Sequence, residues 1–303
     1  MNLFSISQLA QFSGIKPHTI RIWEQRYDAL KPSRSVGNTR YYDGSQLRRL
    51  LNIVSLMDHG LKVSQLCSMS DENLFLLIQN SGNSQTSESS EYYITQLISA
   101  GMSYNEAYFE NVFTMCLLDK GMTVAYKQVL YPMMDRIGLM WASDAIPAAH
   151  EHFISNIIHR KLSAAIDSTP LPDPGSETWL LFLPENEFHE IGLLYAHYMI
   201  RLSGRNVIYL GSNVPMESVY AALNDTKAQN LLMFLVHYDL PDQIQKSLNR
   251  LNSYFSGSNI YLAGNQKLLS QLKFFDKIRS LYNIDSLDLI LQSTENSKFK
   301  STK

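Results

Sequence analysis

Two stretches that suit neither a long helix nor a buried strand divide this chain. Residues 80–90 contain no apolar side chain and are rich in Ser and Asn, a composition typical of a flexible linker. Residues 167–175 include three prolines within five positions, and proline interrupts a helix because it lacks an amide hydrogen. The 303 residues are therefore expected to form three domains, at 1–79, 91–170 and 176–303.

The middle segment, 91–166, has apolar residues at helical spacing throughout. Tyr92, Ile94, Leu97 and Ile98 form the first run, and Phe153, Ile154, Ile157, Ile158 and Leu162 form the last. Four amphipathic helices with short joints predict a four-helix bundle over 91–170.

The last segment alternates short apolar runs with helical stretches, which predicts a doubly wound, parallel α/β sheet of the Rossmann-like kind. We expect strands at 179–183, 206–210, 231–236 and 260–262. We expect helices at 189–203, 215–224, 241–253 and 265–275. Ligands bind at the carboxyl ends of such strands, so the loops after Leu183 and Val236 are the places expected to carry chemistry.

Charge is distributed unevenly along the chain. The formal net charge is −2, yet residues 1–62 hold nine Lys and Arg against four acidic residues, as a surface that faces phosphates requires. There is no apolar run of about 18 residues and no signal-peptide pattern at the N-terminus, so we expect a cytoplasmic protein without a membrane span. Cys67 and Cys116 are interpreted as buried thiols, because they are too far apart in sequence for a metal-sensing thiolate loop.

The first segment has the order of a winged helix-turn-helix. A capped helix over residues 5–14 is closed by Gly14, and a second helix begins near Pro17. A basic, hairpin-like wing at 32–42 follows, and then a long helix at 43–58 and a short one at 63–67. In this arrangement the second helix enters the major groove of DNA. The alternative for the whole region is a small helical interaction domain.

The motif Thr19-Ile20-Arg21-Ile22-Trp23-Glu24, followed by Pro32-x-Arg34 and Arg40-Tyr41-Tyr42, resembles the signature of the MerR family. The resemblance implies that Arg21 lies on the recognition helix and that Tyr41 or Tyr42 contacts the DNA backbone. It also places Arg34 and Arg40 in the wing. Thr19 and Arg26 are expected to make further contacts, and Trp23 to pack beneath the helix. Most members dimerise through a long helix after this module, whereas here the linker leaves oligomerisation to the later domains.

A second motif, Glu187-x-His189-x-x-Gly192, follows the first predicted strand. A neutral imidazole there can ligate a metal while a carboxylate holds its other nitrogen, and glycine allows close approach of a ligand. The simpler interpretation is a solvated loop histidine. The motif resembles that of corrinoid proteins in which histidine ligates cobalt. The resemblance implies cobalamin, with His189 as the axial cobalt ligand and Glu187, Gly192 and Gly264 as binding residues.

A third motif lies in the predicted bundle, where Trp141 is separated by nine residues from Glu151-His152. Bundle before sheet is the order of the methionine synthase cobalamin module. The motif itself resembles the photoreceptor branch of MerR regulators, the CarH and LitR type, which binds adenosylcobalamin. The resemblance implies that Trp141 packs on the upper face of the cofactor, with Glu151 and His152 near the adenosyl group. Alternatively, Trp141 is a core residue and the Glu-His pair a solvated helix start.

Three positions depart from the family pattern. Val236-His237-Tyr238 stands where Ser-x-Leu is common, and Gly264-Asn265 stands where Gly-Gly is common. Both regions would house the nucleotide tail of the cofactor. Ala142 replaces the histidine that photoreceptors carry directly after the tryptophan, so a light-state adduct would need His150 or His152 instead.

These motifs together predict a DNA-binding transcription regulator, a repressor rather than an enzyme, since no second catalytic domain is present. The resemblance implies that cobalamin controls oligomerisation and DNA affinity, with light dependence through adenosylcobalamin. The expected partners are double-stranded operator DNA and further copies of the chain, as a dimer or tetramer formed through the C-terminal domains. The alternative is a MerR-type regulator whose degenerate, cofactor-free fold serves protein–protein interaction.

Overall fold

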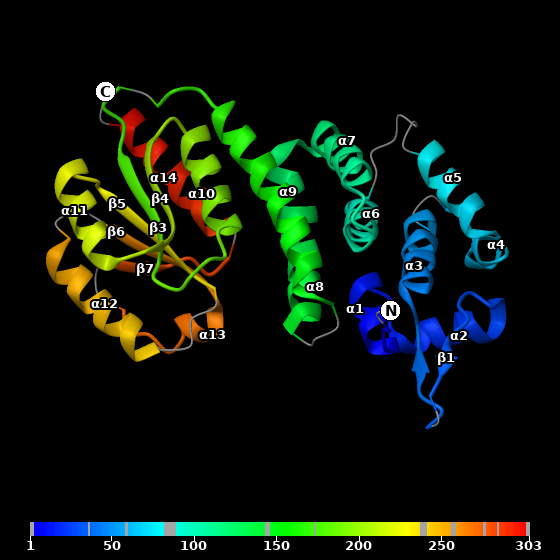
Figure 1. Cartoon of the computed structure of the whole chain (residues 1–303). Helices are drawn as coiled ribbons and strands as arrows, with labels where there is room; N and C mark the ends of the chain where they lie inside the picture. The colour runs from blue at the N-terminus through cyan, green and yellow to red at the C-terminus, as the bar shows by residue number, and fades with distance from the viewer. Residues whose placement is uncertain are drawn as a thin grey trace. The chain divides into compact units, whose positions relative to one another are not determined.

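The computed structural model divides the chain into two compact units, residues 1–157 and 158–303, each described by itself (Figure 1). The structure describes residues 3–35, 37–57, 60–81, 89–142, 146–172, 174–236, 241–255, 259–274, 277–283 and 285–300. Residues 82–88 of the predicted linker, and His237 and Tyr238 of the third loop, lie outside the described residues.

The first unit begins with the predicted helix-turn-helix and wing. A capping box between Ser5 and Gln8 starts the first helix, and Gly14 ends it with a left-handed φ of 69° that favours glycine. Pro17 opens the second helix. The elements are α1 (Ile6–Ser13), α2 (Pro17–Tyr27), the antiparallel pair β1 (Ser33–Arg34) and β2 (Arg40–Tyr41), α3 (Gly44–Met57) and α4 (Val63–Cys67).

The four predicted bundle helices are present, with one further helix before them. Gly121 interrupts the second bundle helix, with a φ of 70°, and a short π-helical segment follows. The elements are α5 (Asp71–Ser81), which the sequence did not indicate, α6 (Ser90–Met102), α7 (Glu106–Ala125), η1 (Tyr126–Leu130), α8 (Tyr131–Ala142) and α9 (Ala148–Asp167).

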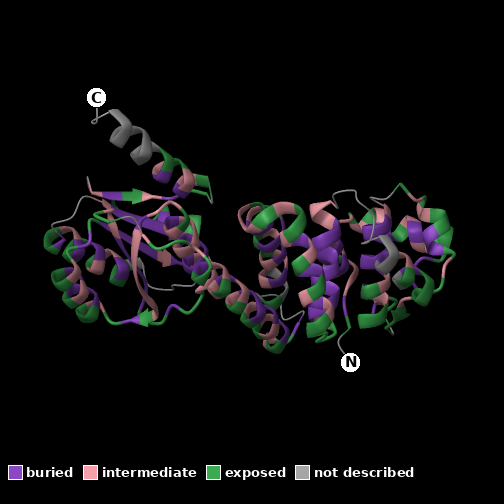
Figure 2. Cartoon of the chain, turned by 90° about the horizontal axis from the view of Figure 1, so that it is seen from above, coloured by how far each residue is buried: buried purple, intermediate pink, exposed green. Residues whose placement is uncertain are grey.

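Helices α3 and α6 form the centre of the first unit. Residues 50–56 of α3 and 92–101 of α6 are all buried (Figure 2), and the two helices pack against each other. A helix buried on every side must lie between two layers. The helix-turn-helix therefore packs directly on the helices that follow it, although the sequence suggested a module joined to them only by a linker.

The second unit is the expected doubly wound sheet. Five parallel strands have the order β4-β3-β5-β6-β7. The strands are β3 (Thr178–Pro184), β4 (Asn206–Val214), β5 (Asn230–Leu235), β6 (Asn259–Gly264) and β7 (Ile278–Ser280), and the helices are α10 (Ile191–Leu202), α11 (Met216–Thr226), α12 (Pro241–Tyr254), α13 (Gln266–Leu269) and α14 (Asp285–Lys300).

Apolar cores cover both faces of this sheet. Helices α10 and α14 contribute to one core, and α11 and α12 contribute to the other, which explains why the central strands read as continuous apolar runs. The sequence did not indicate β7 and α14, and the helix expected at 265–275 is only the short α13. The order of strands reverses between β3 and β5, so the switch point where such sheets bind ligands lies at their carboxyl ends.

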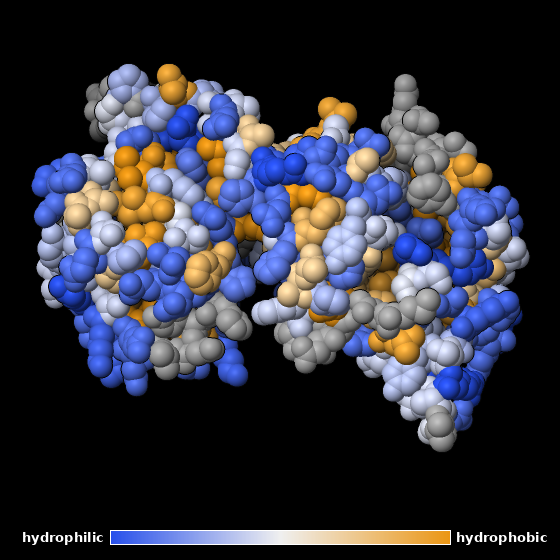
Figure 3. Space-filling model, in the orientation of Figure 1, coloured by the Kyte–Doolittle hydropathy of each residue, from blue (hydrophilic) through white to orange (hydrophobic). Residues whose placement is uncertain are grey.

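The surface is mixed in character. The face seen in Figure 3 is largely hydrophilic and carries separate apolar patches. No helix within the described residues is long and apolar enough to cross a membrane.

Candidate functional site

The outer face of α2 carries exposed cations. Arg21 and Arg26 are exposed and Thr19 is half-buried, so the three residues predicted to contact DNA from this helix can be reached from solvent. Trp23 is only 7% exposed and belongs to the core, as the sequence led us to expect.

The wing is anchored to α2 by a charged residue that the sequence analysis did not single out. Glu24 is nearly buried and its carboxylate lies 3.2 Å from Nε of Arg40. It also accepts a hydrogen bond from the hydroxyl of Tyr42. At the tip of the wing, Nη1 of Arg34 donates to Oδ1 of Asn38 over 2.6 Å. Arg34 is exposed, while Arg40 is partly committed to holding the wing.

Of the two tyrosines proposed for the DNA backbone, only Tyr41 is accessible. Tyr42 is fully buried, and burial raises its pKa above the usual range, so its hydroxyl remains protonated and bonded to Glu24. Tyr42 thus supports the wing from beneath, and Tyr41, which is half-buried, is the alternative that we retain.

Some basic residues of this region serve the fold instead. Arg49 donates hydrogen bonds to the carbonyl oxygens of Ala29, Cys67 and Met69 and pairs with Asp71. It clamps the ends of three segments together. The excess of Lys and Arg in residues 1–62 is therefore larger than the positive charge that this region exposes at its surface.

The loop after β3 is built around a buried carboxylate. Glu187 is fully buried. Its Oε1 accepts hydrogen bonds from the backbone amides of Phe188 (3.0 Å) and His189 (3.1 Å), and its Oε2 accepts one from the amide of Val236 (2.7 Å). Three amide donors compensate the cost of burying the carboxylate. Because Val236 follows β5, this carboxylate joins the two strand ends that flank the switch point.

The same carboxylate fixes the ring of His189. Nδ1 of His189 lies 2.6 Å from Oε1 of Glu187, and the imidazole is 46% exposed. A carboxylate on one ring nitrogen orients the ring, and in metal sites the other nitrogen of such an imidazole is the one that ligates the metal. His189 therefore remains a candidate metal ligand, with a carboxylate contact that the spacing of the motif alone did not establish.

The packing of the protein itself requires glycine at Gly192 and Gly264, the two positions assigned to cofactor binding. A Cβ atom at position 192 would lie 2.7 Å from Cε1 of Phe234, so Gly192 admits the side chain of β5 beneath α10. Gly264 has a φ of 125°, and a Cβ there would collide with the carbonyl oxygen of Leu235. Contacts within the protein therefore require both glycines, and their role toward a cofactor stays a prediction.

A polar cluster behind the loop was not anticipated. The hydroxyl of Tyr209 donates to Glu190 over 2.8 Å, His159 lies 3.5 Å from the other oxygen of Glu190, and the ring of His197 stacks on Tyr209. Burial, followed by the charge of Arg201, lowers the pKa of His197 to about 4, so this histidine is neutral at pH 7. Only its alternation with apolar neighbours in α10 hinted at burial.

The third motif lies in the first unit. Trp141 is 40% exposed, and Nδ1 of His152 lies 3.1 Å from Oε2 of Glu151, with the His152 side chain 72% exposed. His150, by contrast, is buried and its ring stacks on Tyr104 at 4.4 Å between centroids. Of the two histidines considered as replacements for the missing one after Trp141, only His152 is accessible.

Two segments of the chain match known protein families. Residues 4–69 match the family described as MerR HTH family regulatory protein, and residues 93–166 match the B12 binding domain. The chain is 28% identical over 224 residues to the HTH-type transcriptional repressor CarH of Myxococcus xanthus, which covers 73% of this chain and 74% of that protein. It is 24% identical over 250 residues to the HTH-type transcriptional repressor CarA of the same organism, covering 80% of each chain.

A solved structure has a similar fold over part of the chain. The monomethylamine corrinoid protein of Methanosarcina barkeri matches with a TM-score of 0.50 and 14% sequence identity, covering 68% of this chain and 100% of that one. Together with the family matches, this likeness confirms the predicted fold classes. The chain thus combines a MerR-type helix-turn-helix with a B12-binding domain.

Proposed function

We propose that the protein is a DNA-binding transcription repressor whose DNA affinity and assembly depend on cobalamin held by His189. The observation that carries the proposal is the Glu187–His189 pair, with its 2.6 Å contact, at the switch point of the sheet. The similarity to two transcriptional repressors supports the sign of regulation.

The DNA-binding half of the proposal rests on the exposed face of α2 and on the wing. Arg21 and Arg26 would enter or flank the major groove, and Arg34 and Tyr41 would contact the backbone. Arg40, being paired with Glu24, would mainly position the wing. Phosphate contacts of this kind make binding depend strongly on salt concentration.

The cofactor half rests on residues that fit a corrin. Adenosylcobalamin, when bound, would supply a cobalt ion that an imidazole can ligate and a cobalt–carbon bond that light can break. In this chain, Glu187 orients His189 for that ligation, and the half-exposed ring is accessible from solvent. Trp141, Glu151 and His152 are proposed as further contacts of the cofactor. Light dependence requires a substitute for the histidine missing after Trp141, and His152 is our candidate.

Assembly into a dimer or tetramer would increase DNA affinity, because a second helix-turn-helix in the same complex binds at high effective concentration. Apolar side chains exposed on the single chain, including Leu118 and Leu171, each 84% exposed, are compatible with further association. In this proposal, the bundle helices and the sheet determine the number of copies in the assembly.

One observation favours a second function. The side chain of Phe234 packs closely at Gly192, and Gly264 is followed by Asn265 where Gly-Gly is common, as expected if the fold no longer accommodates a cofactor tail. In that case the sheet unit would act as a platform for another protein, and DNA binding would not respond to cobalamin.

The test is to add adenosylcobalamin to the full chain in the dark and to record the corrin absorption spectrum after removing unbound cofactor. We expect retained corrin with a spectrum of histidine ligation in the wild type and loss of that spectrum in His189→Ala. His159→Ala is the matched control, because His159 is similarly exposed, at 43%, and is not paired with Glu187. If the wild type retained no corrin, the cobalamin proposal would fail and the second function, a platform for another protein, would be favoured.

A further inference from the structure

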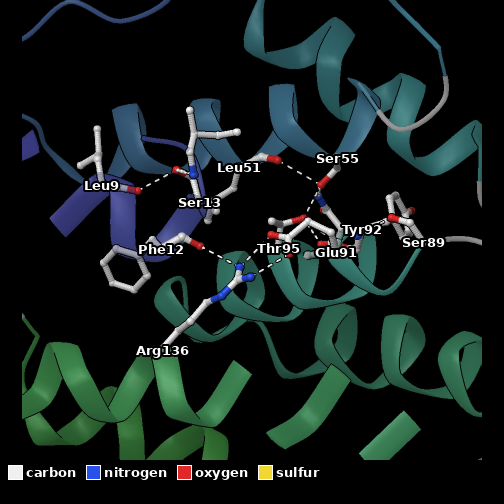
Figure 4. A network of polar contacts seen from close by, with 12 residues as sticks. Leu9, Phe12, Ser13, Leu51, Ser55, Ser89, Glu91, Tyr92, Thr95 and Arg136 are labelled. Carbon is white, nitrogen blue, oxygen red and sulfur yellow. Dashed lines mark hydrogen bonds and ion pairs between the residues drawn. The ribbon is translucent and has the colours of Figure 1, made fainter. Parts of the chain in front are cut away.

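One arginine of the bundle holds the turn of the helix-turn-helix. Arg136, on α8, forms a bidentate ion pair with Glu91 of α6, with both contacts at 2.7 Å, and it donates to the carbonyl oxygen of Phe12 over 3.4 Å. Its guanidinium also lies against Gly14. Figure 4 shows this side chain between the end of α1 and α6. Three helices thus meet at a single guanidinium.

A second set of polar contacts, which is buried, joins α3 to α6. Oγ of Ser55 is 2.5 Å from Oγ1 of Thr95, and Nε2 of Gln96 donates to Ser55 over 2.7 Å. Tyr108 of α7 donates in turn to Gln96. Ser55, Thr95 and Gln96 are at most 1% exposed.

Such contacts fix one register between the two helices. Apolar surfaces alone tolerate sliding, whereas a shift here would take the buried amide of Gln96 away from Ser55, at the cost of an unpaired donor. The hydroxyls of Ser55 and Thr95 also donate to carbonyl oxygens of their own helices. We call Arg136, Glu91, Ser55, Thr95 and Gln96 the joint.

The joint leaves the proposed DNA-binding surface open. It uses the end of α1 and the inner side of α3, while Arg21, Gln25 and Arg26 on α2 remain exposed. The helix-turn-helix can therefore stay packed on the bundle and still present its recognition helix.

We propose that the joint holds the helix-turn-helix in one fixed orientation on the bundle, with Arg136 as the positioning residue. Only the statement that this surface binds DNA rests on the proposed function. The recognition helix then moves with the bundle as one body. Because Arg136 and Trp141 lie on the same helix, a displacement of α8 at its Trp141 end is passed to the Phe12–Gly14 turn.

The experiment measures a distance within the full chain, without DNA or cobalamin, so its result does not depend on either activity. Spin labels are attached to cysteines introduced at two exposed positions, Gln25 on α2 and Thr114 on α7. Pulsed electron paramagnetic resonance on the labelled parent chain is expected to give one narrow distribution of the distance between the two labels. A chain lacking both introduced cysteines corrects for any labelling of Cys67 and Cys116.

Variants then test Arg136 itself. Arg136→Glu places two acidic groups together and is expected to broaden the distribution, and the exchange Glu91→Arg with Arg136→Glu is expected to restore the narrow one. Asp135→Asn, an exposed neighbour on α8, is the control and should change nothing. A broad distribution in the parent, or a narrow one in Arg136→Glu, overturns the proposal. A purely stabilising role would lower the melting temperature without broadening, and recovery in the exchange variant shows that the broadening is not misfolding.

Discussion

The two candidate sites hold their charges in opposite ways. On the helix-turn-helix, Arg21, Arg26 and Arg34 are exposed, so water and counterions balance their charge and a bound polyanion could replace them. In the sheet unit, Glu187 is fully buried and already accepts bonds from three amides and one imidazole. The first surface is therefore separable from folding, whereas the second is part of it. Substitutions should change binding alone in the first and stability as well in the second.

The largest effect should follow Glu187→Ala, which would remove the acceptor of three backbone amides and release His189. Each buried donor left without a partner costs about 1–3 kcal/mol, and we expect the free energy of unfolding of the sheet unit to fall by about 3–5 kcal/mol. Urea denaturation followed by circular dichroism measures this. Glu185→Ala, at an exposed position of the same loop, should have little effect. Equal stabilities of the two variants would refute the contrast.

Gly192→Ala sharpens the contrast between the exposed surface and the buried loop, because its effect on packing can be measured without any cofactor. The added methyl group would press on Phe234, and overpacking of this kind costs about 1–3 kcal/mol. Combining it with Phe234→Leu, which shortens the opposing side chain, should recover most of the lost stability in the same denaturation assay. Absence of recovery would show that the glycine is required for another reason.

The pH dependence of the sheet unit should reveal His197. Its pKa is lowered to about 4, mainly by burial, with Arg201 lowering it and Asp167 raising it. The unfolded chain therefore binds the proton first, and the stability of the unit should fall as the pH drops from 6.5 towards about 4. His197→Phe keeps an aromatic ring against Tyr209 and should weaken this dependence. An unchanged pH profile in that variant would contradict the burial of a neutral histidine.

The smallest effect belongs to the exposed surface. Arg21→Ala should weaken binding to a mixed-sequence DNA duplex by roughly tenfold, and it should lower the salt slope by about 0.9 where Arg21 flanks the groove at one phosphate. It should leave stability unchanged. Lys246→Ala removes one exposed positive charge from the sheet unit and serves as the control in a fluorescence anisotropy titration. Similar affinities of both variants would count against α2 as the contact helix.

Local signals predicted much of this molecule. Ser5, Gly14 and Pro17 marked the ends of α1 and the start of α2, and the apolar runs located β3 to β6, because capping and burial are written in neighbouring residues. The spacing of Glu187 and His189 likewise suggested a paired imidazole.

Contacts between residues distant in sequence were not predictable in the same way. Nothing near Ser55 indicates that it meets Thr95, nothing near Glu24 indicates that it anchors Tyr42, and Phe234 gave no sign that it fills the space at Gly192. The short strand β7 carries too few residues for a clear period. These features depend on tertiary packing, which pattern reasoning does not reach.

One measurement tests the central claim directly, namely the affinity of the full chain for DNA in the dark, with and without adenosylcobalamin. The DNA duplexes are first selected from a random-sequence pool by their binding to the protein. The account predicts tighter binding with the cofactor for the wild type and no response for His189→Ala, with Arg21→Ala weakened in both conditions. Equal affinities of the wild type with and without adenosylcobalamin would contradict it.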